Sequence, residues 1–162
     1  DWSSDVCSSD LYLTVQDMLW IHLQLAKRVE PFDYARMEDG TYYQYAYGKS
    51  VDIPAQAGRF LKGFAEKAPF ETCNEATAFV AGFAFLRLNG YHVHIKDHEA
   101  LSWYRGLCSH AQPGEALRHR LEMDPHHDDH EPAVRESVLA VIEEFPETIR
   151  ELLKPNLQLQ ES

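Results

Sequence analysis

Residues 74–89 read NEATAFVAGFAFLRLN, and apolar side chains lie on every side of the helix that this stretch predicts. A helix that is apolar all round has to be buried, so we expect it to be the central element of the fold. Asn89 and Gly90 end it, because glycine suits the left-handed position that follows a helix.

Amphipathic helices are predicted on the N-terminal side of this central helix. Thr14 has the position of an N-cap ahead of a helix whose apolar stripe includes His22, and Asp52 with Pro54 opens a second helix. His22 is expected to be a hydrogen-bonded core histidine, with a catalytic or ligand role as the alternative.

Further helices are predicted on the C-terminal side. Asp97 is expected to cap one of them, and residues 134–145 form another, which Pro146 ends or restarts. The segment 91–95 alternates polar and apolar residues but is too short to imply a sheet. The pattern therefore predicts an all-α fold, with six or seven helices around a buried helix at about 74–89.

One domain is predicted over residues 12–153, with a core at 12–109 and C-terminal helices at 115–153. Residues 154–162 have the composition of a tail. The first eleven residues, DWSSDVCSSDL, match a translated sequencing-library adapter, so we treat them as an artefactual leader and leave them out of the fold.

The charge of the chain excludes some partners. The formal net charge is −11, so no general attraction to nucleic-acid phosphates is expected. No apolar run is long enough to span a membrane. The three cysteines, at positions 7, 73 and 108, lack paired or metal-type spacing, which is typical of a reducing compartment or of a chain that makes no use of cysteine. We therefore expect a cytoplasmic protein that binds neither nucleic acid nor membrane.

Residues 32–50 carry five tyrosines and few aliphatic residues, and turn residues interrupt them. We expect a segment that is partly helix and partly loop, covering one side of the domain. The tyrosines are predicted to form an aromatic lid over the core, and stacking on a nucleotide base is the alternative.

Two features together resemble a known protein family. One is APFETCNEA at 68–76, which runs directly into the buried helix, and the other is FLRLNGY at 85–91, where that helix ends. The opening YLTVQDMLWIHLQL at 12–25 is similar to the first helix of the same family. The chain from about residue 12 to 107 thus resembles the Fic/Doc superfamily, and most of all its short death-on-curing type.

The resemblance implies a particular chemistry. The family's loop has the pattern His-Pro-Phe-x-Asp/Glu-Gly-Asn-Gly/Lys-Arg. Its His is the base for a target hydroxyl, its acidic residue binds Mg²⁺, and its Gly-Asn turn and Arg hold the phosphates of ATP. The family transfers AMP to a protein hydroxyl, or a phosphate in the death-on-curing toxins.

This chain keeps only part of that pattern. Pro69, Phe70 and Asn74 match, and these are positions with packing or turn roles. The differing positions are those that supply the chemistry. Ala68 stands at the position of the base, Thr72 at that of the acid and Cys73 at that of the Gly, and Glu75 and Ala76 stand at the Gly/Lys and Arg positions. We therefore assign no catalytic residue.

The loop itself also disfavours phosphate binding. It offers Glu71 and Glu75, but from Ala68 onward no Lys or Arg occurs before Arg87. Thr72 and Glu75 have the spacing of a capping box, in which each side chain bonds the backbone N–H of the other residue. We expect these two side chains to seal the helix start that would otherwise hold a phosphate.

Several substitutes could restore an active site. Cys73 at a helix start could act as a nucleophile. His22, His92 or His94 could serve as the base, and Glu71 could bind a metal.

A separate candidate is HHDDH at 126–130, where His126, His127 and His130 could hold Zn²⁺ or Ni²⁺. The alternative is a solvated linker.

The sequence thus favours an inactive Fic/Doc relative that needs no cofactor and acts by binding another protein. The candidate surface for a partner or nucleotide comprises Asn74, Tyr42, Tyr43 and Tyr45. Two alternatives stay open: a divergent, toxin-like transferase that uses ATP and Mg²⁺, and a metal-responsive binding module.

Overall fold

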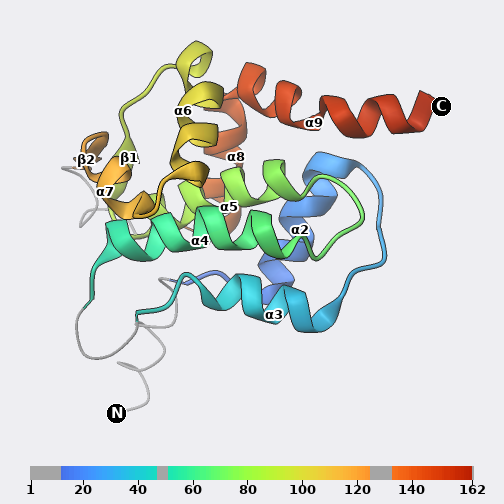
Figure 1. Cartoon of the computed structure of the whole chain (residues 1–162), viewed down its shortest axis with the longest axis horizontal. Coiled ribbons are helices and arrows are strands. Elements are labelled where there is room, and N and C mark those ends of the chain that lie inside the picture. Colours follow the sequence, from blue (N-terminus) through green and yellow to red (C-terminus); the bar gives the residue numbers. More distant parts are fainter. Residues whose placement is uncertain (1–11, 47–50, 125–132, 162) are drawn as a thin grey trace.

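The computed structural model describes residues 12–46, 51–124 and 133–161 (Figure 1). These residues form eight helices and two short strands. Their order is α2 (Val15–Ala26), α3 (Tyr34–Tyr42), α4 (Ile53–Lys67), α5 (Asn74–Leu88), β1 (Tyr91–Val93), α6 (Asp97–Ser109), α7 (Pro113–Arg118), β2 (Leu121–Met123), α8 (Val134–Glu144) and α9 (Pro146–Glu161).

The predicted all-α class is confirmed. The described residues form eight helices, one more than the upper limit of the predicted six or seven. The additional helix is α7, a short helix that begins at Pro113. Proline suits the first position of a helix because the N–H that it lacks has no partner there.

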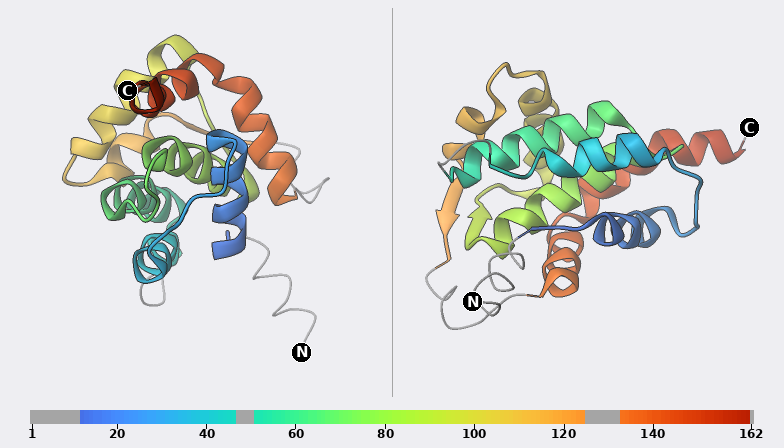
Figure 2. Two further views of the ribbon diagram at one scale, coloured as in Figure 1. Left: turned by 90° about the vertical axis from the view of Figure 1, so that its right-hand side faces the viewer. Right: turned by 90° about the horizontal axis from the view of Figure 1, so that it is seen from below.

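The helix α5 is the buried centre of the fold, as its composition predicts. Twelve of its 15 residues are buried, and it packs against α2, α4, α8, α9 and β1. Seen along its axis in Figure 2 (left), α5 lies among α2, α4 and α8. A Cβ atom on Gly82 would overlap the Leu61 side chain of α4, so the missing side chain allows these two helices to approach closely.

The helix α2 begins as the sequence predicts. The Thr14 hydroxyl accepts a hydrogen bond from the Asp17 N–H (3.1 Å), and the Asp17 carboxylate accepts one from the Thr14 N–H (2.8 Å). This reciprocal pair is a capping box. His22, in the middle of the same helix, is 2% exposed.

The helices α3 and α4 pack together on one side of α5 (Figure 1). Asp33 and Asp52 are their N-caps, and Asp52 was predicted. After α3, the buried Gln44 side chain bonds both the N–H and the C=O of Leu13, each at 2.7 Å. This bond pair fixes the end of α3 against the segment that precedes α2.

The strands β1 and β2 form a small antiparallel sheet in which Tyr91 lies opposite Met123 and Val93 opposite Leu121. The prediction that the segment 91–95 is too short to imply a sheet is wrong. Its first three residues pair with Leu121–Met123.

The role predicted for Asp97 is wrong. Asp97 is the first residue of α6 rather than its N-cap, and α6 has no side-chain cap. Its carboxylate instead accepts hydrogen bonds from the N–H groups of Glu147 (2.8 Å) and Thr148 (2.9 Å) at the start of α9. Asp97 therefore caps a helix that lies 50 residues further along the chain.

The helix α9 continues through most of the predicted tail, 154–162. It runs from Pro146 to Glu161 and passes through Pro155, and its C-terminal half extends away from the other helices (Figure 1). Pro155 has no N–H to donate to the preceding turn. A helix of 16 residues nevertheless forms, so the proline does not end it.

Candidate functional site

The loop that carries the family-like pattern connects α4 to α5. Ala68 ends α4 in the left-handed conformation (φ 46°), and its N–H donates to the Phe64 carbonyl. Cys73 has the same conformation (φ 65°) and is the N-cap of α5. Glycine adopts this region without strain, whereas other residues rarely do. Cys73 stands where the family pattern has Gly, so a non-glycine residue holds a glycine-type turn here.

The three matching positions have the packing and turn roles that were predicted for them. The Asn74 side chain accepts from the Phe70 N–H (3.0 Å) and donates to the Phe70 carbonyl (2.8 Å), which closes the loop. The Phe70 ring stacks on His22 with the ring centres 3.7 Å apart. Pro69 is buried, and its carbonyl accepts from the Asp33 N–H (2.9 Å).

The capping box predicted for Thr72 and Glu75 does not form. The N-cap is Cys73, one residue later than the pattern requires, and α5 has no side-chain cap. Glu75 is exposed, and it occupies the second helical position, not the third that a capping box needs. Both Thr72 donors bond a different carboxylate, that of Glu30: the N–H at 3.0 Å, and the hydroxyl as well.

Glu30 is the centre of a buried polar network that the sequence did not predict. The side chain is 3% exposed, and it accepts from the Arg28 Nε–H at 2.9 Å in addition to both Thr72 donors. Burial raises the pKa of Glu30, but the hydrogen bonds from Thr72 and Arg28 together outweigh burial and lower it. The carboxylate is therefore ionised at neutral pH.

His22 completes this network. Its Nε2 atom lies 3.0 Å from the Thr72 carbonyl oxygen and 3.3 Å from the Glu30 carboxylate. Both partners are acceptors, so Nε2 carries a hydrogen. Burial lowers the pKa of His22, and the bond to Thr72 and the Glu30 charge offset only part of this effect. The expectation of a hydrogen-bonded core histidine is confirmed.

Arg28 brings a positive charge to a loop that has none of its own. Its Nη2 atom lies 3.5 Å from the Thr72 hydroxyl, while its Nε is bonded to Glu30. Arg28 and Glu30 directly follow α2, and their sequence distance from the loop matches no known motif. Because their contacts with Thr72 span 44 and 42 residues, no local pattern could have revealed them.

The substitutes for the missing catalytic groups are not placed for that role. Cys73 is buried, which raises the pKa of its thiol and disfavours the thiolate. His92 follows the C-terminal end of α5, roughly 20 Å along the helix from the loop. It lies 2.7 Å from the Glu144 carboxylate. Glu71 is exposed, and a single carboxylate is a poor Mg²⁺ site.

The candidate metal ligands His126, His127 and His130 lie outside the described residues. Within the part of the chain that the structure describes, no group of three or more His, Cys, Asp or Glu side chains could hold a metal ion.

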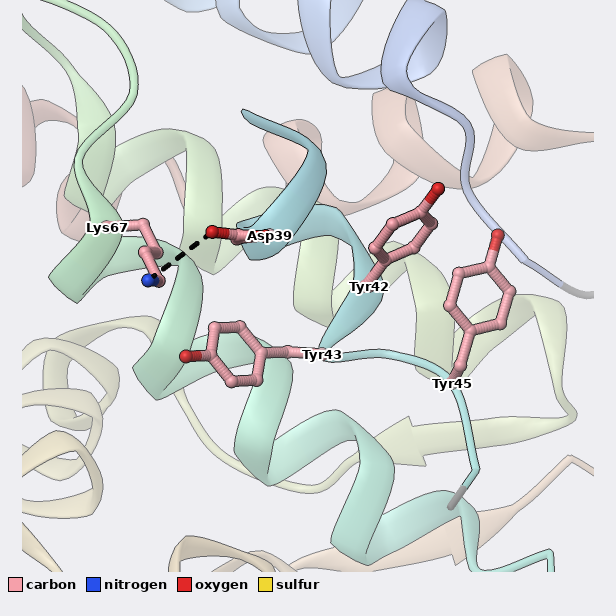
Figure 3. A pocket seen from close by; sticks show the side chains of 5 residues that line it. All are labelled: Asp39, Tyr42, Tyr43, Tyr45 and Lys67. Atoms are coloured by element: carbon pink, nitrogen blue, oxygen red, sulfur yellow. Dashed lines mark ion pairs between the residues drawn. The ribbon is translucent and has the colours of Figure 1, made fainter. Parts of the chain in front are cut away.

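The tyrosine-rich segment forms a pocket. An open cavity of about 420 Å³ is lined by Asp39, Tyr42, Tyr43, Tyr45 and Lys67. Figure 3 shows Asp39 and Lys67 facing each other at one side, Tyr42 and Tyr45 together at the other, and Tyr43 between them. Three of the four residues predicted as a binding surface are therefore brought together. The fourth, Asn74, is bonded to Phe70 in the loop.

The tyrosines of this pocket differ in exposure. Tyr42 is 53% exposed, and its ring centre lies 5.7 Å from that of Tyr45. Tyr43 lies against α4, where a Cβ atom on Gly63 would overlap its ring. Tyr43 thus acts as the predicted lid over the core, whereas Tyr42 offers its ring to solvent.

Comparison with known proteins found no relative of this chain. No protein-family model, no curated protein and no solved structure matches the chain. Among the described residues, no helix has both the length and the apolar character needed to cross a membrane.

Proposed function

We propose that this chain is a Fic/Doc-like domain that lacks the family's transferase activity and acts by binding another protein. The tyrosine pocket is the observation on which the proposal rests. Three tyrosines and an ion pair line one cavity at the end of α3. Tyrosine is enriched at protein interfaces because its ring is apolar and its hydroxyl can bond.

The loop geometry supports the absence of transferase activity. General-base catalysis needs a titratable group within reach of the target hydroxyl, and Ala68 has none. His22, which contacts the loop, is buried and donates to the Thr72 carbonyl. Thr72, in the position of the metal-binding acid, has both its donors on Glu30.

The left-handed turn at Cys73 supports the family resemblance. The family pattern has Gly at this position, and the φ of 65° is one that glycine adopts readily. A buried apolar helix follows directly, as in the family. The turn is thus kept although the groups that would use it for chemistry are replaced.

One observation favours the alternative, a divergent nucleotide-dependent transferase. Because the predicted capping box does not form, no side chain caps the start of α5. Backbone N–H groups at a helix start can hold a phosphate. Thermal unfolding with ATP and Mg²⁺ tests this: we expect no saturable rise in the melting temperature, and such a rise would support the transferase.

Capture of a partner tests the proposed function. We expect the immobilised wild-type chain to retain a partner that Tyr42→Ala no longer retains. Leu139→Ala is the matched control, because Leu139 is 51% exposed on α8, against 53% for Tyr42. Equal capture by Tyr42→Ala and Leu139→Ala would contradict the proposal.

A further inference from the structure

We infer that the tyrosine pocket binds a cationic side chain, an arginine or lysine of the protein partner. This inference rests on the proposed function and specifies the chemistry of the partner. The pocket joins aromatic ring faces to one carboxylate, Asp39. Ring faces carry a negative potential, so they and the carboxylate attract the same sign of charge.

The aromatic wall of the pocket is already assembled. The rings of Tyr42 and Tyr45 lie 5.7 Å apart at an angle of 51°. Tyr45 in turn packs against Tyr12, with ring centres 4.6 Å apart. A cation within about 6 Å of such a ring centre gains cation–π energy. A ligand that binds there would therefore need to order few side chains.

The Asp39 carboxylate is accessible to a ligand. Its side chain is 59% exposed, and its contact with Lys67 is long, at 3.6 Å. An exposed ion pair of this kind contributes little to stability. An arginine that entered the pocket could therefore displace Lys67 and bond Asp39 through both arms of its guanidinium. Lys67 is then a competitor for the same carboxylate.

The openness of the cavity and the net charge of the protein agree with a cationic side chain as the ligand. The cavity is open to solvent, so the end of a partner's side chain can reach it. Without Asp1, Asp5 and Asp10 of the leader the net charge of −11 becomes −8, and this negative charge attracts a basic partner over distance. Binding is therefore expected to weaken as the salt concentration rises.

An anionic ligand, such as a phosphate group, would use the same pocket differently. Lys67 is the one cation among the five lining residues, so an anion would depend on Lys67 and be repelled by Asp39. A cationic ligand would depend on Asp39 and compete with Lys67. The variants Asp39→Asn and Lys67→Gln thus have opposite effects for the two ligand types.

The test uses a Gly/Ser peptide with three arginines, and the same peptide with citrulline in their place, titrated into the full chain. We expect the arginine peptide to bind and the citrulline peptide not to bind. Asp39→Asn should weaken binding about tenfold, as expected for the loss of a bond between charged groups. Lys67→Gln should strengthen it about threefold.

Three results would overturn the inference: equal binding of the citrulline peptide, no effect of Asp39→Asn, or loss of binding in Lys67→Gln. Other results distinguish a failure of this inference from a failure of the proposed function. If partner capture depends on Tyr42 but not on Asp39, the pocket binds a partner through other chemistry. If the arginine peptide needs Asp39 while Tyr42→Ala leaves capture unchanged, the cation site stands and the partner surface lies elsewhere.

Discussion

Glu30 accepts both the backbone N–H and the hydroxyl of Thr72, a residue 42 positions further along the chain. In the Fic/Doc pattern that this loop resembles, the position of Thr72 holds a metal-binding acid. A carboxylate is thus present beside this place, but it comes from the segment after α2 and is buried. Its hydrogen bonds to Thr72 and Arg28 make it a structural group that holds the loop.

Glu30→Ala is expected to lower the free energy of unfolding by about 2–3 kcal/mol. The substitution leaves both donors of the half-buried Thr72 without their acceptor, and such unpaired donors are costly, whereas the Arg28 side chain is 43% exposed and can bond water instead. Urea unfolding measures the change. Glu71→Ala is the control from the same loop, since Glu71 is exposed. Equal stability of the two variants would show that the network does not hold the loop.

Stability is expected to depend on the protonation of His22. Burial holds its pKa below the ordinary 6.5, so the unfolded chain binds this proton more tightly than the folded one. As pH falls below 6.5, protonation therefore favours unfolding, by about 1.4 kcal/mol for each unit that separates the two pKa values. The contribution is complete above pH 6.5 and is lost as pH falls toward the folded pKa.

His22→Gln separates this effect from those of the other eight histidines. Glutamine keeps an N–H donor for the Thr72 carbonyl but does not titrate in this range. We expect the wild type to lose more stability than the variant between pH 7 and pH 5, as measured by urea unfolding. Parallel pH profiles would mean that His22 has the same pKa in the folded and unfolded chains.

The difference between Thr14 and Thr72 shows how far a local pattern can predict structure. Both residues precede an acidic residue by three positions, and only Thr14 forms a capping box. The Asp17 carboxylate bonds the Thr14 N–H. Thr72 instead contacts Glu30, a buried acceptor from a distant segment, and α5 starts one residue later. Local spacing does not reveal a competing partner far along the chain.

The central helix was predictable for the opposite reason. The composition of residues 74–89 demands burial whatever surrounds them, and the start of α5 at Asn74 agrees with the prediction. The tyrosine surface was predictable in part, because Tyr42, Tyr43 and Tyr45 are close in sequence. Lys67 joins them only through the packing of α3 on α4, which the sequence does not specify.

Asp97→Ala is expected to lower the free energy of unfolding by about 1–2 kcal/mol, the usual cost of losing an N-cap. The variant removes the acceptor of the two N–H groups at the start of α9. Glu99→Ala, in the same turn of α6, is the control, since the Glu99 side chain is half exposed. Chemical denaturation followed by circular dichroism gives both values. A loss of the same size in Glu99→Ala would point to α6 itself rather than to the cap.

Gly63→Ala is expected to disturb the tyrosine pocket. The new methyl group would overlap the Tyr43 ring, and such overpacking typically costs about 1–3 kcal/mol. If the Tyr43 ring is the cause, then Tyr43→Ala should remove most of this penalty when the two substitutions are combined. A double-mutant cycle by urea unfolding measures the coupling. Additive effects would mean that the strain falls on the α4 backbone instead, and that Tyr43 does not rest on Gly63 in solution.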